Sequence, residues 1–275
     1  MSSLRRMTTF WDDHIGGWLD GDNDISEPLD KCKLLDKWYG SYAGKGHGKV
    51  TLAGMPEPWI GDLTSPDRAR LVILGLNPGH YIEDLQARKS LDSKEGLYAE
   101  QVRKLGSYTK WAATNPYLID PWKGKKDLEK KVLGINRYHA TRQSFARRWL
   151  GDPNLPESAV VLLELYPWHS TGITGPMRPD PELIRHFVWE PIDELTNVRD
   201  IFAFGKPWVS QLEKLGMKPD FILGKGGDDY GSSVASRSVH VYNISVCKRI
   251  IVSWHTGSAG PPSAKETALL KKALD

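Results

Sequence analysis

Four apolar runs in this 275-residue chain each end in residues that could take part in chemistry. The first run, Leu71–Leu74, leads into the turn Gly75-Leu-Asn-Pro-Gly79, which places Asn77 at its crest. An asparagine side chain accepts and donates hydrogen bonds at once, so Asn77 could hold a water or the polar edge of a ligand. The other three runs end in Glu164, in Gly205-Lys206 and in His255. A carboxylate such as Glu164 at the exit of a buried strand is costly unless it is paired or used.

These residues require elements that bring them together. The continuous apolar runs, rich in β-branched residues, predict buried strands over residues 71–74, 159–169, 198–204 and 249–255. Helices are expected over 85–105, 181–195 and 264–274, and from Gly205 onward. This alternation predicts a three-layer α/β fold with a central, mostly parallel sheet of about four strands. The carboxyl ends of such strands meet at one edge, where open α/β sheets bind ligands.

The first 54 residues are polar and interrupted by glycines, with one amphipathic patch around Leu34, Leu35 and Trp38. We expect an N-terminal extension over 1–54, followed by an α/β domain over 55–275. Within the extension, Gly44-Lys-Gly-His-Gly-Lys49 resembles a phosphate loop but lacks the required earlier glycine, a preceding strand and a hydroxyl residue after the lysine. It is predicted to be a flexible surface loop, with contact to phosphates left open. Aromatic and proline-rich residues 111–122, and glycine- and serine-rich residues 221–238, are predicted to be loops as well.

Basic residues are concentrated between Pro121 and Leu150, where nine lysines and arginines stand against two acidic residues, for a local net charge of +7. The whole chain carries only +3, from 37 basic and 34 acidic residues. Such clustering predicts a phosphate-contacting face, although a solvated helix would have the same composition. The candidates for this contact are Lys123, Lys125, Lys126, Arg137 and Arg142.

The composition of the chain argues against a metal or cofactor site and against a membrane protein. The two cysteines, Cys32 and Cys247, match no metal-ligand spacing, so neither a metal site nor a cofactor is expected. No apolar run approaches the roughly 20 residues that cross a bilayer, and the first residues lack the apolar core of a signal peptide. We therefore expect a cytoplasmic protein that has no membrane partner.

The strand ends resemble the motifs of the uracil-DNA glycosylase superfamily. Gly75-Leu-Asn-Pro-Gly79 is similar to the turn of its mismatch-specific and single-strand-selective branches, and Ala203-Phe-Gly-Lys-Pro207 to its Trp-Gly-Lys strand end. Val252-Ser-Trp-His255 is similar to its last motif, although Thr256 and Gly257 replace Pro-Ser. The resemblance covers about residues 55 to 260. It implies a monofunctional enzyme that everts a base from duplex or single-stranded DNA, hydrolyses its N-glycosidic bond and leaves an abasic site.

The resemblance also implies roles for individual residues. Asn77 would hold the attacking water, and His255 would donate to the departing base oxygen. Gly75 would line the base site, and Lys206 and Ser258 would contact the DNA. A ring that stacks on the everted base is needed as well, and Tyr81 and Trp168 are the candidates, although either could be core packing instead.

Two departures from the family bear on the substrate. Gly79 stands where classical members carry a tyrosine that blocks bulk at C5 of the pyrimidine, and Glu164 stands where an asparagine reads uracil. A carboxylate accepts from the exocyclic amine of cytosine, so we expect a C5-modified cytosine as substrate. This preference resembles antiphage glycosylases that remove glucosylated hydroxymethylcytosine from viral DNA. The alternatives are a housekeeping repair glycosylase for uracil or mispaired bases, and a DNA-binding module without activity.

Overall fold

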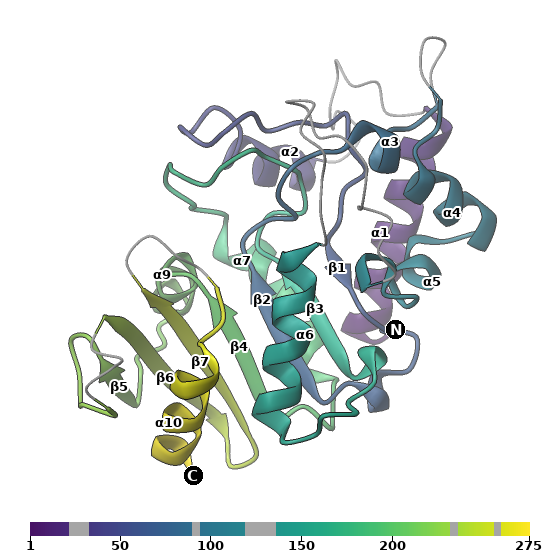
Figure 1. Cartoon of the computed structure of the whole chain (residues 1–275). Helices are drawn as coiled ribbons and strands as arrows, with labels where there is room; N and C mark the ends of the chain where they lie inside the picture. Colours follow the sequence, from purple (N-terminus) through teal and green to yellow (C-terminus); the bar gives the residue numbers. More distant parts are fainter. Residues whose placement is uncertain (22–32, 90–93, 119–135, 232–235, 256–259) are drawn as a thin grey trace.

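The computed structural model of the chain describes residues 1–21, 33–89, 94–118, 136–231, 236–255 and 260–275 (Figure 1). In these residues one seven-stranded sheet has the strand order β1-β3-β2-β4-β7-β6-β5. The strands are β1 (Trp59–Ile60), β2 (Leu71–Gly75), β3 (Val160–Glu164), β4 (Asp200–Phe204), β5 (Phe221–Gly224), β6 (Arg237–Ser245) and β7 (Lys248–His255). The chain therefore has an α/β fold, as its sequence predicts.

The sheet is mixed. Strands β3, β2, β4 and β7 run parallel to one another, whereas β1, β6 and β5 pair antiparallel. The expectation of about four, mostly parallel strands is thus not confirmed, because three further strands extend the sheet on both sides. Residues 221–238, predicted to be a loop, contain β5 and the start of β6. The pairing of β5 with β6, and of β6 with β7, makes these two parts of the stretch extended, which local composition does not reveal.

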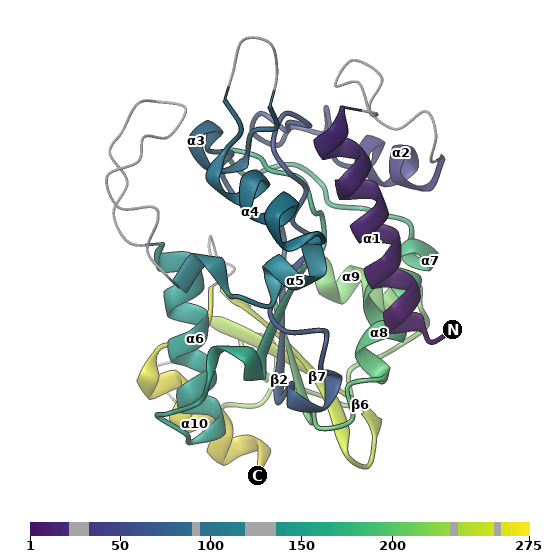
Figure 2. The same ribbon diagram turned by 90° about the vertical axis from the view of Figure 1, so that its right-hand side faces the viewer.

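Helices cover both faces of the sheet (Figure 2). Alternate side chains of β2 enter two separate cores: Leu71 and Ile73 pack with α6 (Arg137–Leu150) and α10 (Ala264–Leu274), and Val72 and Leu74 pack on the opposite face. That opposite core also receives α1 (Ser3–Asp20) and α9 (Pro207–Lys214). The remaining helical elements are α2 (Lys33–Gly40), η1 (Pro66–Arg68), α3 (Glu83–Gln86), α4 (Leu97–Leu105), α5 (Tyr108–Ala112), η2 (Pro116–Leu118), η3 (Glu157–Ala159), α7 (Pro181–Ile184), η4 (Arg185–Trp189) and α8 (Glu190–Asp193).

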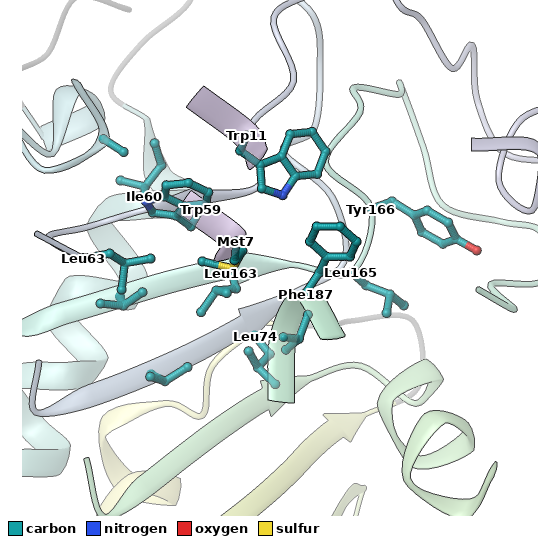
Figure 3. Close-up of a cluster of buried hydrophobic side chains, with 14 of the residues drawn as sticks. Met7, Trp11, Trp59, Ile60, Leu63, Leu74, Leu163, Leu165, Tyr166 and Phe187 are labelled. Carbon is teal, nitrogen blue, oxygen red and sulfur yellow. The ribbon is translucent and has the colours of Figure 1, made fainter. Parts of the chain in front are cut away.

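The N-terminal segment belongs to the larger of the two cores. Helix α1 begins after Ser2, whose side chain accepts from the backbone of Arg5, and ends at Gly21 in the left-handed conformation. Its buried residues, spaced three or four apart, pack in one cluster with residues of β2 and β3 (Figure 3). They are Leu4, Met7, Trp11, Ile15, Trp18 and Leu19. The predicted helix over 85–105 is instead two helices, α3 and α4, and the predicted loop over 111–122 begins inside α5.

A buried ion pair fixes the strand that ends in His255. Asp200 on β4 lies opposite Arg249 on β7, and the Arg249 Nε donates to Asp200 Oδ1 over 2.6 Å. The indole of Trp149 donates to the other carboxylate oxygen over 2.8 Å, so both acceptor oxygens are used. This ion pair sets the register of β7 against β4, and with it the position of His255 at the end of the strand.

Among the described residues, no helix is both long enough and apolar enough to cross a membrane.

Candidate active-site pocket

A pocket of about 750 Å³ lies at the carboxyl edge of the parallel strands. The segments after β2, β3 and β4 and the last residues of β7 all contribute to it, as expected for the ligand edge of an open α/β sheet. Its polar lining side chains include those of Asn77, His80, Tyr138, Ser170, Lys206 and His255. None of the described lining residues is acidic. The structure thus brings Asn77, Lys206 and His255, which lie far apart in the sequence, to one cavity.

The turn that carries Asn77 is held by hydrogen bonds from the segment after β3. The backbone N–H groups of Leu165 and Tyr166 donate to the carbonyls of Gly75 and Leu76, over 3.2 and 3.0 Å. The Asn77 side chain is 7% exposed, and its Nδ2 donates to the Ser170 hydroxyl over 3.0 Å. Because the amide nitrogen is used in this way, the carbonyl Oδ1 is the group that can accept from a molecule in the pocket.

Gly79, after β2, and His255, at the end of β7, line the pocket on either side of β4. Gly79 has a φ of 86°, and a Cβ built there would have no heavy atom within 4 Å. The absence of a side chain at this position therefore leaves open space beside Asn77. His255 ends β7, where it is half-buried and lies next to Trp254, another lining residue. Lys206 is exposed at the start of α9.

Glu164 lies behind the pocket rather than in its lining. It is 5% exposed, and its Oε1 accepts from the hydroxyl of Tyr138 over 2.7 Å. Its Oε2 has no hydrogen-bond partner among the described residues. Burial raises the pKa of Glu164 to about 8, a rise that nearby Glu57 reinforces and that Arg142 and the Tyr138 hydrogen bond oppose. The carboxyl group therefore retains its proton at neutral pH, and direct reading of a base by Glu164, as the sequence predicts, does not fit its position.

Tyr138 is the residue that separates Glu164 from the pocket. It lines the cavity from the first turn of α6, while its hydroxyl donates inward to Glu164. The guanidinium of Arg142 lies over its ring at 3.3 Å from the centroid and also donates to its backbone carbonyl. Arg142 is only 6% exposed, so its predicted role as a surface phosphate contact is wrong. Its positive charge instead holds the Tyr138 ring in place.

Gly75 provides the space that this arrangement needs. It lies opposite Glu164 in the β2–β3 register, and a Cβ built on it would overlap Glu164 Oε2 and the Tyr138 hydroxyl. We expect Gly75→Ala to lower the free energy of unfolding by about 1–3 kcal/mol, the usual cost of overpacking a core. Urea denaturation would measure this change. Gly79→Ala is the control, because it adds the same Cβ at a position with open space. Only the positive φ of Gly79 is unfavourable for alanine. Equal losses in both variants would contradict the packing argument.

Several predicted site residues lie elsewhere. Trp168 is fully buried, with ring centroids 5.7 Å from Trp38 and 5.3 Å from Tyr39, so it is core and cannot stack on a base. Tyr81 is half-buried against His169 and does not line the pocket. Arg137 is exposed at the start of α6, outside the pocket lining. The predicted DNA contacts Lys123, Lys125, Lys126 and Ser258 lie outside the described residues.

Two residues of the site were missed by sequence reasoning. Tyr138 precedes Arg142 by four residues, a spacing that places an aromatic ring and a guanidinium on the same helix face, and this signal was available. Ser170 gave no such signal, because its role depends on the fold bringing it to Asn77 and to the hydroxyl of Tyr42, 2.6 Å away.

Neither a protein-family model nor a curated protein matches this chain significantly. In the part of the chain that is described, no cluster of three or more histidine, cysteine, aspartate or glutamate side chains could hold a metal ion.

Proposed function

We propose that this protein is a DNA glycosylase that hydrolyses the N-glycosidic bond of an everted nucleotide. The observation that carries the proposal is that Asn77 and His255 line one pocket whose described lining contains no acidic side chain. Breaking this bond leaves negative charge on the base, and a pocket that offers hydrogen-bond donors without carboxylates favours that charge. The pocket volume also falls within the range of roughly 300–1,000 Å³ that is typical of ligand sites.

In this proposal the chain supplies two groups to the reaction. The Asn77 Oδ1 accepts a hydrogen bond from a water and orients its oxygen toward the anomeric carbon of the sugar. As the bond from that carbon to the base breaks, the water oxygen forms the new bond to the same carbon. His255 donates to the base oxygen that gains charge, and the water's proton leaves for the base or for solvent. The products are a free base and an abasic site, and the DNA strand stays intact. Asn77 is not a strong base, so slow turnover is expected.

The favoured substrate is a cytosine that carries a substituent at C5, such as glucosylated hydroxymethylcytosine in phage DNA. Two features support this preference: the open space at Gly79, and the hydroxyl of Tyr138. That hydroxyl gives its hydrogen to Glu164, so its oxygen can take part in a further contact only as an acceptor. An acceptor there matches the exocyclic amine of cytosine and repels the corresponding carbonyl of uracil. Glu164 thus acts as a positioning residue for Tyr138.

The direct test is abasic-site formation by the full chain on synthetic DNA that contains one target base. Glucosylated hydroxymethylcytosine should be released, with uracil and plain cytosine released more slowly. Release of uracil while the modified cytosines are ignored would favour a housekeeping repair enzyme instead. Release of no base, with DNA still bound, would leave a binding module.

Tyr138→Phe tests how the base is read. The variant keeps the ring under Arg142 but removes the acceptor oxygen, so the preference for modified cytosine over uracil should fall roughly 3- to 10-fold, the effect of one hydrogen bond. The preference is measured as the ratio of single-turnover rate constants on the two substrates. Tyr42→Phe, which removes a hydroxyl that lies beside Ser170, is the matched control and should leave the ratio unchanged. A ratio that stays at the wild-type value in Tyr138→Phe would remove Tyr138 from base recognition.

A further inference from the structure

The loop Gly44–Lys49 packs on the pocket wall, although the site described above does not use it. It follows α2 and lies alongside residues 171–175, all of which except Thr174 line the pocket (Figure 1). Four hydrogen bonds join the two segments: Gly48 N–H to the Gly172 carbonyl at 2.9 Å, Lys49 N–H to Thr171 Oγ1 at 3.2 Å, Gly175 N–H to His47 Nδ1 at 3.3 Å, and the Thr174 hydroxyl to the Gly46 carbonyl.

Glycines on both segments permit this close approach. A Cβ on Gly175 would overlap the carbonyl oxygen of Lys45, and a Cβ on Gly48 would overlap the Thr171 side chain. The loop lies at the surface, as predicted, and its backbone is docked against the pocket wall. Docking of this kind holds the lysines of the loop at a defined place beside the pocket.

Three lysines flank the pocket on two sides. Lys45 and Lys49 are exposed on the loop that packs against residues 171–175, the segment after β3. Lys206 is exposed on the segment after β4. The strand order β3-β2-β4 places the Asn77 turn between these two segments. None of the three lysines forms an ion pair with a described residue, so their charges are available to a ligand. The near-neutral net charge of the chain does not reveal this local arrangement.

We infer that Lys45 and Lys49 on one side and Lys206 on the other neutralise the backbone phosphates that flank the everted nucleotide. An extruded nucleotide stays connected to phosphates on both sides, so a pocket that receives it must accommodate two phosphodiesters at its mouth. Contacts of this kind fix the position of the strand without reading its sequence. The inference rests on the proposed function for its ligand, DNA, but it concerns binding of the backbone alone.

The test compares the salt dependence of DNA binding in two double variants of the full chain. In Lys45→Gln/Lys49→Gln the fall of log K with log salt should be less steep by about 2, one for each phosphate that is no longer neutralised. Binding at 0.1 M salt should weaken roughly 10-fold or more. Lys218→Gln/Lys272→Gln is the control, because these exposed lysines precede β5 and end α10, at the opposite edge of the sheet. The probe is a fluorescein-labelled single-stranded DNA of ordinary bases, measured by anisotropy. Equal slopes in the two double variants would overturn the inference.

Excision assays separate this inference from the proposed function. At protein concentrations well below saturation, Lys45→Gln/Lys49→Gln should release the base more slowly, in proportion to its weaker DNA binding. Lys45→Arg/Lys49→Arg, which keeps the charge, should bind as the wild type does. If the wild type released no base but the glutamine variant still showed a reduced salt dependence, the phosphate contacts of the lysines would be supported and the glycosylase activity would not. If bases were released and the glutamine variant bound DNA as well as the wild type, the phosphate contacts would be refuted and the glycosylase activity supported.

Discussion

Asn77→Ala and His255→Ala are each expected to lower the single-turnover rate of abasic-site formation by about 10²–10⁴-fold, the range in which positioned catalytic groups contribute. Asn77 has the acceptor oxygen that orients the water, and alanine removes it. His255 donates to the departing base, and alanine leaves the new charge without that donor. The rates are measured on modified-cytosine DNA at saturating protein, so that weaker binding does not enter the result.

Several controls make this prediction specific. Asn154→Ala removes an amide that is exposed in the loop before β3, at the other edge of the sheet, and should leave the rate unchanged. Asn77→Ala should unfold within about 1 kcal/mol of the wild type, because the Ser170 hydroxyl keeps its partner Tyr42. DNA affinity should also persist in both alanine variants. Wild-type rates in either variant would refute the role given to that residue.

The central strands could be predicted from the sequence, but the edges of the sheet could not. Buried parallel strands need continuous apolar runs, and Leu71–Leu74 has no other good explanation. Strand β5 and the start of β6 lie in a glycine-rich stretch, and their extended form depends on the pairing of β5 with β6 and of β6 with β7. Helix α1 did carry a signal, the spacing of Leu4, Met7 and Trp11, which its glycines and acidic residues concealed.

The site was predictable to the extent that strand ends determine it. Asn77 and Lys206 follow parallel strands and His255 ends one, so topology alone brings them to one edge. Trp168 also follows a strand, but the chain turns after Tyr166 and directs the indole into the core beside Trp38. Side-chain direction after a turn depends on tertiary packing rather than on spacing. For the same reason Arg142, assigned to the surface by its charge, lies buried over a ring.

The raised pKa of Glu164 makes the stability of the fold depend on pH. Burial raises its pKa in the folded protein to about 8, whereas the unfolded chain keeps a value near the ordinary 4.5. Between these values the folded protein binds a proton that the unfolded chain releases, so stability falls as pH rises from about 4.5 to about 8. Each unit of pKa corresponds to about 1.4 kcal/mol, which makes the total loss on the order of a few kcal/mol.

Glu164→Gln removes this proton linkage, since an amide does not titrate in this range. We therefore expect the free energy of unfolding of the variant, relative to wild type, to increase from pH 5 to pH 8 and to level off above that. Urea denaturation of both proteins at several pH values measures this difference. A constant offset from the changed hydrogen bond to Tyr138 does not matter, because only the slope with pH is used.

Glu213→Gln, at an exposed position on α9, is the control, and its free energy of unfolding relative to wild type should not change with pH. A flat difference for Glu164→Gln as well would mean that the Glu164 carboxyl is ionised in the folded protein. Tyr138 would then be held by a full negative charge.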